Sequence, residues 1–288
     1  MKPTLLDLGW FSLSSYYTMA FIGVIVGFFI LDREAVRTHL DRKIAFAAGI
    51  YAAIFGYLGA RIQHIIFDGF FEIYLQRPIA MLYFWKGGLA FYGAVIFGMA
   101  AVVTYLSIKC RPIARYLDLF TLPIALGLVI GRIGCFLNGC CFGKISAGSF
   151  AVTFIKNGLS AKKQFTDTML STLRETPYPV IVTQLIEAAL GFLLFLALFF
   201  MRRRITKPGV LMGLWLIGYA VIRAVIEIFR DDDRGLFFNG ILSTSQIIAF
   251  VTFVIGVLLI TLPAEPEAPA VPSTSEDAHA NGRGAIGA

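Results

Sequence analysis

The sequence predicts an all-α, polytopic integral membrane protein with seven transmembrane helices. Of its 288 residues, 58% are hydrophobic and only 15% are charged, whereas a typical soluble domain has about 45–50% and about 25%. The 28 glycines fit the same class, because membrane helices pack closely through small residues. This composition excludes a disordered chain, a coiled coil and a soluble enzyme of ordinary make-up.

Seven apolar stretches are long enough to cross the hydrocarbon core, which takes about 20 helical residues. We expect no cleavable signal peptide, because the first stretch is long and is followed by further ones. The predicted spans are 11–31, 44–67, 88–108, 115–137, 180–200, 209–229 and 241–262.

The distribution of Lys and Arg predicts the orientation of these spans. Eleven Lys and Arg residues lie in the loops after the first, third and fifth spans, whereas the two short loops on the other side hold four Lys and Arg residues. Because cytoplasmic loops collect Lys and Arg, the N-terminus is expected outside and the C-terminus inside. This topology explains the net charge of +7, so we expect no nucleic-acid partner.

The expected transmembrane domain covers residues 1–262. One segment inside it and one segment after it do not belong to the spans. Residues 142–179 form a connection too long for a simple turn, so we expect them to fold over the outer face. The tail, 263–288, is rich in Pro, Ala and Ser and is expected to be disordered in the cytoplasm.

Polar and charged side chains interrupt four of the spans at a similar depth. A charge at the bilayer centre costs at least about 2.5–3.5 kcal/mol, so such residues usually pair or serve a function. With the orientation above, all lie in the outer half of the membrane or at its outer edge. They are Arg61, Arg132, Gln184, Glu187, Arg223, Glu227 and Arg230.

Three interpretations of this polar layer remain open. Each arginine could extend to the interface without a further role, or it could pair internally, as the i, i+4 spacing of Arg223 and Glu227 allows. The three arginines within the spans outnumber the two acids, however, and a surplus cation suits an anionic ligand. Arginine can bind a phosphate through two parallel donors.

Two glycine-rich segments flank the layer, at 85–93 and 131–143. Glycines such as Gly87 and Gly88 let the backbone approach a bulky ligand closely, and Asn138 followed by glycine is typical of a helix end. Helix packing is the alternative explanation for such glycines.

These motifs together resemble the prolipoprotein diacylglyceryl transferase family of bacterial inner-membrane enzymes. The segment 131–143 is similar to the family's signature block, and 87–93 is similar to its Gly-Gly-x-Ser-Phe-His-Gly block. The segments 213–230 and 242–246 resemble the blocks of the sixth and seventh spans. The resemblance covers about residues 10–260.

The resemblance implies transfer of the diacylglyceryl group of phosphatidylglycerol to the lipobox cysteine of a prolipoprotein, with release of glycerol phosphate. The implied partners are phosphatidylglycerol, the prolipoprotein signal peptide and membrane lipids, with no cofactor. It assigns catalysis to Arg132 and Arg223, with Tyr92 as a third position. The implied substrate-binding residues are Tyr16, Arg61, Gly87, Gly88, Asn138, Gln184, Glu187, Glu227 and Arg230.

The chain departs from the family's pattern at three places, as a divergent member would. Tyr92 stands where the family has His, and tyrosine is a poorer general base at neutral pH. The segment 135–140 lacks one Asn and the Glu, and 181–187 lacks a His, a Pro and a Tyr. His64, one turn from Arg61, is a second candidate base. A non-catalytic lipid-binding relative or carrier is the alternative function.

Three cysteines gather at the outer end of the fourth span: Cys135, Cys140 and Cys141. No CxxC spacing or His partner accompanies them, so the sequence predicts no metal site. A disulfide, a lipid-accepting thiol, a membrane thiol oxidoreductase and simple apolar packing remain open. Cys110 lies on the cytoplasmic side by this topology and cannot join them.

Overall fold

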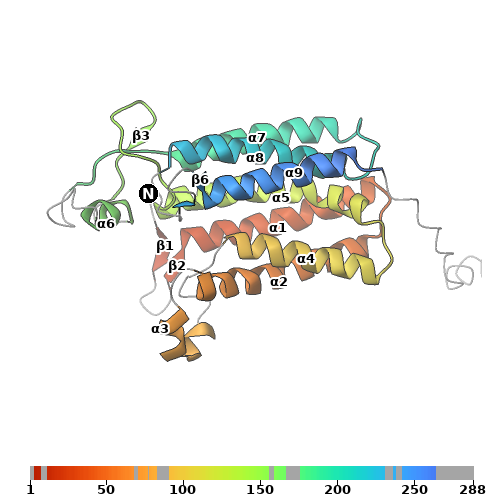
Figure 1. Cartoon of the computed structure of the whole chain (residues 1–288), viewed down its shortest axis with the longest axis horizontal. Helices are drawn as coiled ribbons and strands as arrows, with labels where there is room; N and C mark the ends of the chain where they lie inside the picture. Colours follow the sequence, from red (N-terminus) through yellow and green to blue (C-terminus); the bar gives the residue numbers. More distant parts are fainter. Residues whose placement is uncertain are drawn as a thin grey trace, which may run out of the picture.

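The computed structural model shows a bundle of long helices that run along a common axis (Figure 1). The described residues are 3–7, 12–67, 71–76, 78–82, 91–155, 159–166, 176–230, 236–237 and 242–263. Within them, seven helices have 18 or more residues. These are α1 (Ser15–Arg37), α2 (Arg42–Phe67), α4 (Phe91–Ile108), α5 (Ile113–Asn138), α7 (Thr183–Met201), α8 (Val210–Ile228) and α9 (Thr244–Thr261).

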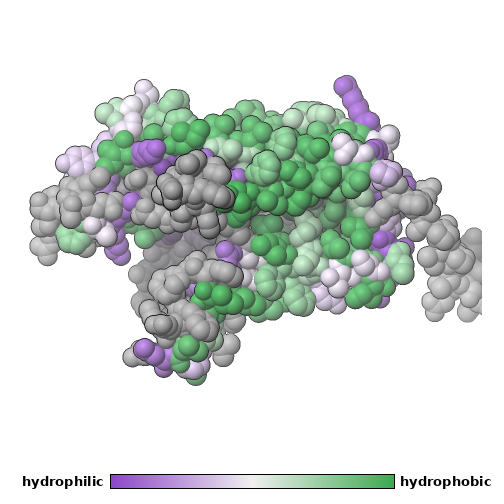
Figure 2. Space-filling model, in the orientation of Figure 1, coloured by the Kyte–Doolittle hydropathy of each residue, from purple (hydrophilic) through white to green (hydrophobic). Residues whose placement is uncertain are grey.

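The membrane character of the bundle follows from length and composition. Among the described residues, four helices are long and apolar enough to cross a membrane: α2, α5, α7 and α8. Figure 2 shows a broad hydrophobic surface over the middle of the bundle and hydrophilic residues toward its ends. Large apolar side chains such as Phe21, Ile96 and Phe250 are about two-thirds exposed, as expected for contact with lipid. The prediction of a mostly helical membrane protein is confirmed.

Short strands shift the starts of three helices relative to the apolar stretches. The strand β2 (Ser12–Ser14) precedes α1, β4 (Val180–Ile181) precedes α7, and β6 (Leu242–Ser243) precedes α9. Their partners are β1 (Thr4–Asp7), β3 (Ala151–Val152) and β5 (Leu236–Phe237), all antiparallel. The helices therefore begin about three residues after the hydrophobicity does.

The remaining small elements lie at the same end of the bundle as the strands (Figure 1). They are α3 (Phe71–Gln76), the 3-10 helix η1 (Pro78–Leu82) and α6 (Leu159–Thr166). Gln164 fixes α6 to the chain before β4, because its amide donates to the Tyr178 carbonyl and accepts from the Tyr178 N–H at 3.1 and 2.8 Å. The proposed disordered tail falls outside the described residues apart from its first one.

Close helix contacts depend on glycine. A Cβ atom on Gly213 of α8 would lie 2.7 Å from the Gly256 carbonyl of α9, and one on Gly256 would lie 2.8 Å from the Gly213 carbonyl. Gly59 of α2 and Gly93 of α4 meet in the same way. In lipid, helices gain little from hydrophobic burial, so contacts of this kind carry much of the association energy.

We therefore expect Gly213→Ala to destabilise the protein by about 1–3 kcal/mol, because the added methyl group overpacks the α8–α9 contact. The matched control is Gly131→Ala in α5, where a Cβ atom meets nothing within 4 Å. The midpoint of denaturant unfolding in a mild detergent measures both. Equal losses for the two variants would contradict the packing argument.

Candidate functional site

Five charged side chains form one network near the end of the bundle that carries the strands, and we call it the Arg–Glu cluster. Arg132 Nη2 of α5 lies 2.8 Å from Glu187 Oε1 of α7. Arg223 Nη1 of α8 lies 3.8 Å from Glu187 Oε2, and its Nη2 lies 2.7 Å from Glu227 Oε2. Arg230 Nε lies 3.9 Å from the same Glu227 oxygen. The cluster thus ties three helices together.

The cluster is buried, which makes its charges interact strongly. The Glu187 side chain is fully buried, that of Arg223 is 5% exposed and that of Arg132 is 13% exposed. Two neutral groups add hydrogen bonds: the Tyr219 hydroxyl donates to Glu187 Oε1 at 3.1 Å, and Arg223 Nη2 donates to Ser245 Oγ at 2.9 Å. Four helices, α5, α7, α8 and α9, therefore contribute to the site.

The cluster holds more positive than negative charge. Its three arginines face two glutamates. The Nη1 atom of Arg223 has no hydrogen-bond partner within the described part of the chain. A buried surplus of guanidinium donors suits an anion, because charge-assisted and bidentate contacts with phosphate are among the strong hydrogen bonds.

A tight turn after α5 lies beside the cluster. Gly139 has a φ of +73°, and the N–H groups of Gly139 and Cys140 donate to the carbonyls of Phe136 and Cys135, both at 3.1 Å. This is the Schellman motif that often ends helices. The motif turns the chain back so that Cys140 lies against Cys135.

The first turn of α7 holds this turn in place. Gln184 Nε2 donates to the Cys140 carbonyl at 2.7 Å, and Thr183 Oγ1 donates to the Cys141 carbonyl at 2.9 Å. The nitrogen of Gln184 is therefore used within the protein. Its Oε1 atom is buried and has no hydrogen-bond partner among the described residues.

The other predicted site residues that the structure describes lie on α1, α2 and α5. Arg61 of α2 donates from Nε to the Met81 carbonyl at 3.1 Å, and its guanidinium lies 5.1 Å from the centre of the Tyr74 ring. Tyr16 lies in the first turn of α1, where its ring packs edge to face with that of Tyr17 at 5.5 Å between the ring centres. Asn138 is the last residue of α5 and is half-buried.

Three predicted residues cannot be placed. Gly87, Gly88 and the side chain of Tyr92 lie outside the described residues. Conversely, Tyr219, Ser245 and Thr183 belong to the site but were not among the predicted site residues. Tyr219 lies one turn before Arg223 on α8, so the helical period offered a signal for it.

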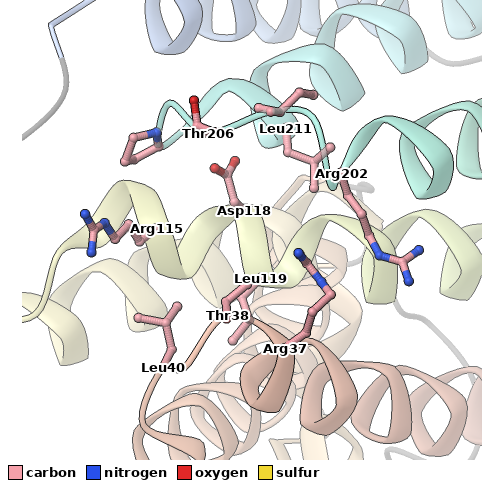
Figure 3. A pocket seen from close by; sticks show the side chains of 11 residues that line it. Arg37, Thr38, Leu40, Arg115, Asp118, Leu119, Arg202, Thr206 and Leu211 are labelled. Atoms are coloured by element: carbon pink, nitrogen blue, oxygen red, sulfur yellow. The ribbon is translucent and has the colours of Figure 1, made fainter.

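A polar pocket at the opposite end of the bundle has a structural explanation (Figure 3). It has a volume of about 260 Å³, and Asp118 and Arg202 are among its lining residues. The Asp118 carboxylate accepts from the N–H groups of Gly209 and Met212, both at 2.8 Å, and so caps the start of α8 from another helix. Arg202 Nε lies 3.1 Å from a carboxylate oxygen of Glu34.

The Arg–Glu cluster predicts a steep cost for removing its central carboxylate. We expect Glu187→Gln to destabilise the protein by about 3–5 kcal/mol, because Arg132 and Arg223 would lose their shared counter-ion in a buried site. Tyr219→Phe, which removes one hydrogen bond to the same carboxylate, should cost only about 1 kcal/mol. Thermal unfolding in detergent compares the two, and similar losses would show that the ion pairs do not hold the cluster.

Comparison with known proteins identifies the family of the chain. The family described as prolipoprotein diacylglyceryl transferase matches residues 3–262. A phosphatidylglycerol–prolipoprotein diacylglyceryl transferase of Clostridium tetani is 30% identical over 262 residues, which cover 91% of this chain and 98% of the relative. Proteins of the same name from Photobacterium profundum and Buchnera aphidicola are 28% and 34% identical, over 90% and 73% of this chain and 92% and 77% of their own lengths. The chain therefore belongs to the prolipoprotein diacylglyceryl transferase family.

Proposed function

We propose that this protein transfers the diacylglyceryl group of phosphatidylglycerol to the lipobox cysteine of prolipoproteins, a step of lipoprotein maturation. Membership of the family supports this function, because the match extends over residues 3–262. The observation that carries the mechanism is the buried Arg–Glu cluster with its surplus of positive charge. That charge suits the phosphate of the lipid.

We further propose that all seven long helices cross the bacterial inner membrane, with the N-terminus outside. The connections α1–α2, α4–α5 and α7–α8 lie at one end of the bundle (Figure 1), and the eleven Lys and Arg residues lie in or beside them. By the positive-inside rule this end is cytoplasmic. The Arg–Glu cluster, near the opposite end, then lies at the depth of the outer-leaflet headgroups.

In this proposal Arg132 and Arg223 bind the phosphate and stabilise the charge that develops on it as glycerol phosphate leaves. Arg132 is the more exposed of the two, so it is the first to meet a lipid headgroup. Glu187 and Glu227 position these guanidiniums through their ion pairs. The remaining proposed substrate-binding residues are Tyr16, Arg61, Gly87, Gly88, Asn138, Gln184 and Arg230.

The proposed reaction is an alkylation of sulfur. The lipobox thiol loses its proton, and the sulfur attacks the glyceryl carbon that carries the phosphate. The C–S bond forms as the C–O bond breaks, and the electron pair leaves with the phosphate oxygen of glycerol phosphate. A free thiol has a pKa near 8.5, so the site has to favour the thiolate at neutral pH.

We expect Arg132→Ala and Arg223→Ala each to lower transfer by on the order of 10²–10³-fold, because each removes a preorganised group that stabilises transition-state charge. Lys at either position should recover little, because its ammonium lacks the bidentate geometry. The assay is rescue of a strain depleted of its own transferase, with the mass of a reporter lipoprotein as the readout.

The matched control for this assay is Arg33→Ala, since Arg33 is exposed near the C-terminal end of α1, at the end of the bundle opposite to the Arg–Glu cluster. This variant should behave as the wild type. Full activity of the Arg132 and Arg223 variants would mean that the cluster is structural and that the mechanism is wrong. Failure of the wild-type protein to rescue, despite insertion and binding of phosphatidylglycerol, would favour a non-catalytic lipid-binding relative.

Tyr92 provides an independent test, because the family has His at this position. We expect Tyr92→Phe to reduce transfer through loss of a hydrogen-bonding hydroxyl, and Tyr92→His to be tolerated or to improve it. Initial rates of transfer to a lipobox peptide measure both variants. A Tyr92→Phe variant with unchanged rates would remove this residue from the catalytic set.

A further inference from the structure

Three thiols come together at the end of α5, next to the Arg–Glu cluster. The sulfur atoms of Cys135, Cys140 and Cys141 all lie within 4.8 Å of one another, and none of the three forms a disulfide. Cys135 lies in the last turn of α5, and the Schellman motif brings the other two back toward it. Contact between Cys135 and Cys140 is an ordinary result of that motif, but the motif does not account for the third sulfur.

The position of Cys141 is unusual for a residue with a side chain. Its φ is +64°, in the left-handed region that glycine normally occupies. Such conformations persist where the surroundings enforce them, and they concentrate at functional sites. Here Thr183 and Gln184 bind the carbonyls of Cys141 and Cys140. The protein thus uses hydrogen bonds and backbone strain to direct a third sulfur toward the other two.

We propose that Cys135, Cys140 and Cys141 bind a zinc ion whose fourth position takes the sulfur of the lipobox cysteine. Thiolates are soft ligands that favour zinc, and zinc sites of three protein ligands with one open position are catalytic sites. A tetrahedral site with Zn–S bonds of about 2.3 Å needs sulfur atoms about 3.8 Å apart. The three sulfurs therefore have to close by no more than about 1 Å.

This inference rests on the proposed function. It explains how the lipobox thiol loses its proton in a chain that has Tyr92 where the family has the His that could act as a base. Binding to zinc converts the lipobox thiol to a thiolate and releases its proton to solvent. The thiolate sulfur then attacks the glyceryl carbon, and glycerol phosphate leaves with the C–O electron pair. Zinc keeps its oxidation state, so the step needs no oxidant or reductant. The thioether product is a weaker ligand than the thiolate and is released.

The position of the thiols suits this step. Arg132 precedes Cys135 by one helical turn on α5, so a phosphate held by Arg132 lies close to a sulfur bound at the three cysteines. Two residues after Cys141, Gly143 pairs with Arg230 of the cluster in an antiparallel bridge.

The first test measures zinc directly. The full-length protein is purified in phosphatidylglycerol-containing nanodiscs, with reductant and without chelators, and zinc is quantified by mass spectrometry. We expect about one zinc per chain, with large losses for Cys135→Ser, Cys140→Ser and Cys141→Ser. Cys110→Ser is the matched control, because Cys110 is exposed at the opposite end of the bundle and should leave the zinc content unchanged.

The second test examines the fourth ligand. Replacement of zinc by cobalt gives thiolate-to-cobalt absorption bands, and a lipobox peptide should change them. The same peptide with Ser in place of its Cys should not. Removal of zinc from the wild-type protein by a chelator should lower the rate of transfer on the order of 10²-fold, which is typical for the loss of a group that assists proton transfer. Added zinc should restore the rate.

Three results would overturn the proposal: no zinc above the level of the cysteine variants, a disulfide among the three cysteines in the active protein, or full transfer after zinc is removed. The disulfide is detected as a mass lower by about two hydrogens, and it would favour a redox role. Failure of the proposed function gives a different pattern. In that case zinc binds in one-to-one ratio and the cobalt bands respond to the peptide, yet no zinc-loaded sample transfers lipid.

Discussion

The Glu187 carboxylate is the constraint on which the polar end of the bundle depends. Its side chain is fully buried between Arg132 of α5 and Arg223 of α8, and Tyr219 donates to it. An isolated buried carboxylate would be very costly, and so would two buried guanidiniums without it. The packing of α5, α7 and α8 against one another therefore depends on the same contacts that position the two arginines. One turn earlier on α7, Gln184 and Thr183 hold the cysteine turn.

The rest of the bundle follows the physics of lipid rather than of water. Its middle is apolar on the surface (Figure 2), so helices gain from close backbone contact more than from hydrophobic burial. Gly213 and Gly256 provide such a contact between α8 and α9. The polar interactions are concentrated near the two ends, where the Arg–Glu cluster lies at one and the Asp118 cap of α8 at the other. The apolar middle sets the spacing of the helices, and these polar contacts lie near the ends.

The sequence predicted the seven long helices because only apolar stretches of about 20 residues can span the hydrocarbon core. It missed the short strands before α1, α7 and α9, because these are paired by backbone hydrogen bonds that hydrophobicity does not report. Arg132, Glu187, Arg223 and Glu227, which the sequence predicted at a similar depth, form ion pairs with one another. Arg61 was predicted at a similar depth, but its described contacts are with Met81 and Tyr74. The sequence pattern gives the position of a residue along its helix, but it does not give the direction in which that side of the helix faces. The gathering of three sulfurs needed the Schellman turn, whose geometry the spacing alone does not reveal.

The hydrogen bonds from Gln184 and Thr183 to the turn after α5 have a consequence for substitutions in that turn. Gln184 and Thr183 bind the carbonyl groups of Cys140 and Cys141, not their side chains, so these two hydrogen bonds do not depend on which side chains stand at these positions. A different side chain at position 140 would therefore leave these two hydrogen bonds in place. At 141 the left-handed backbone is the further restriction. The turn is thus held through its main chain, by side chains of the first turn of α7.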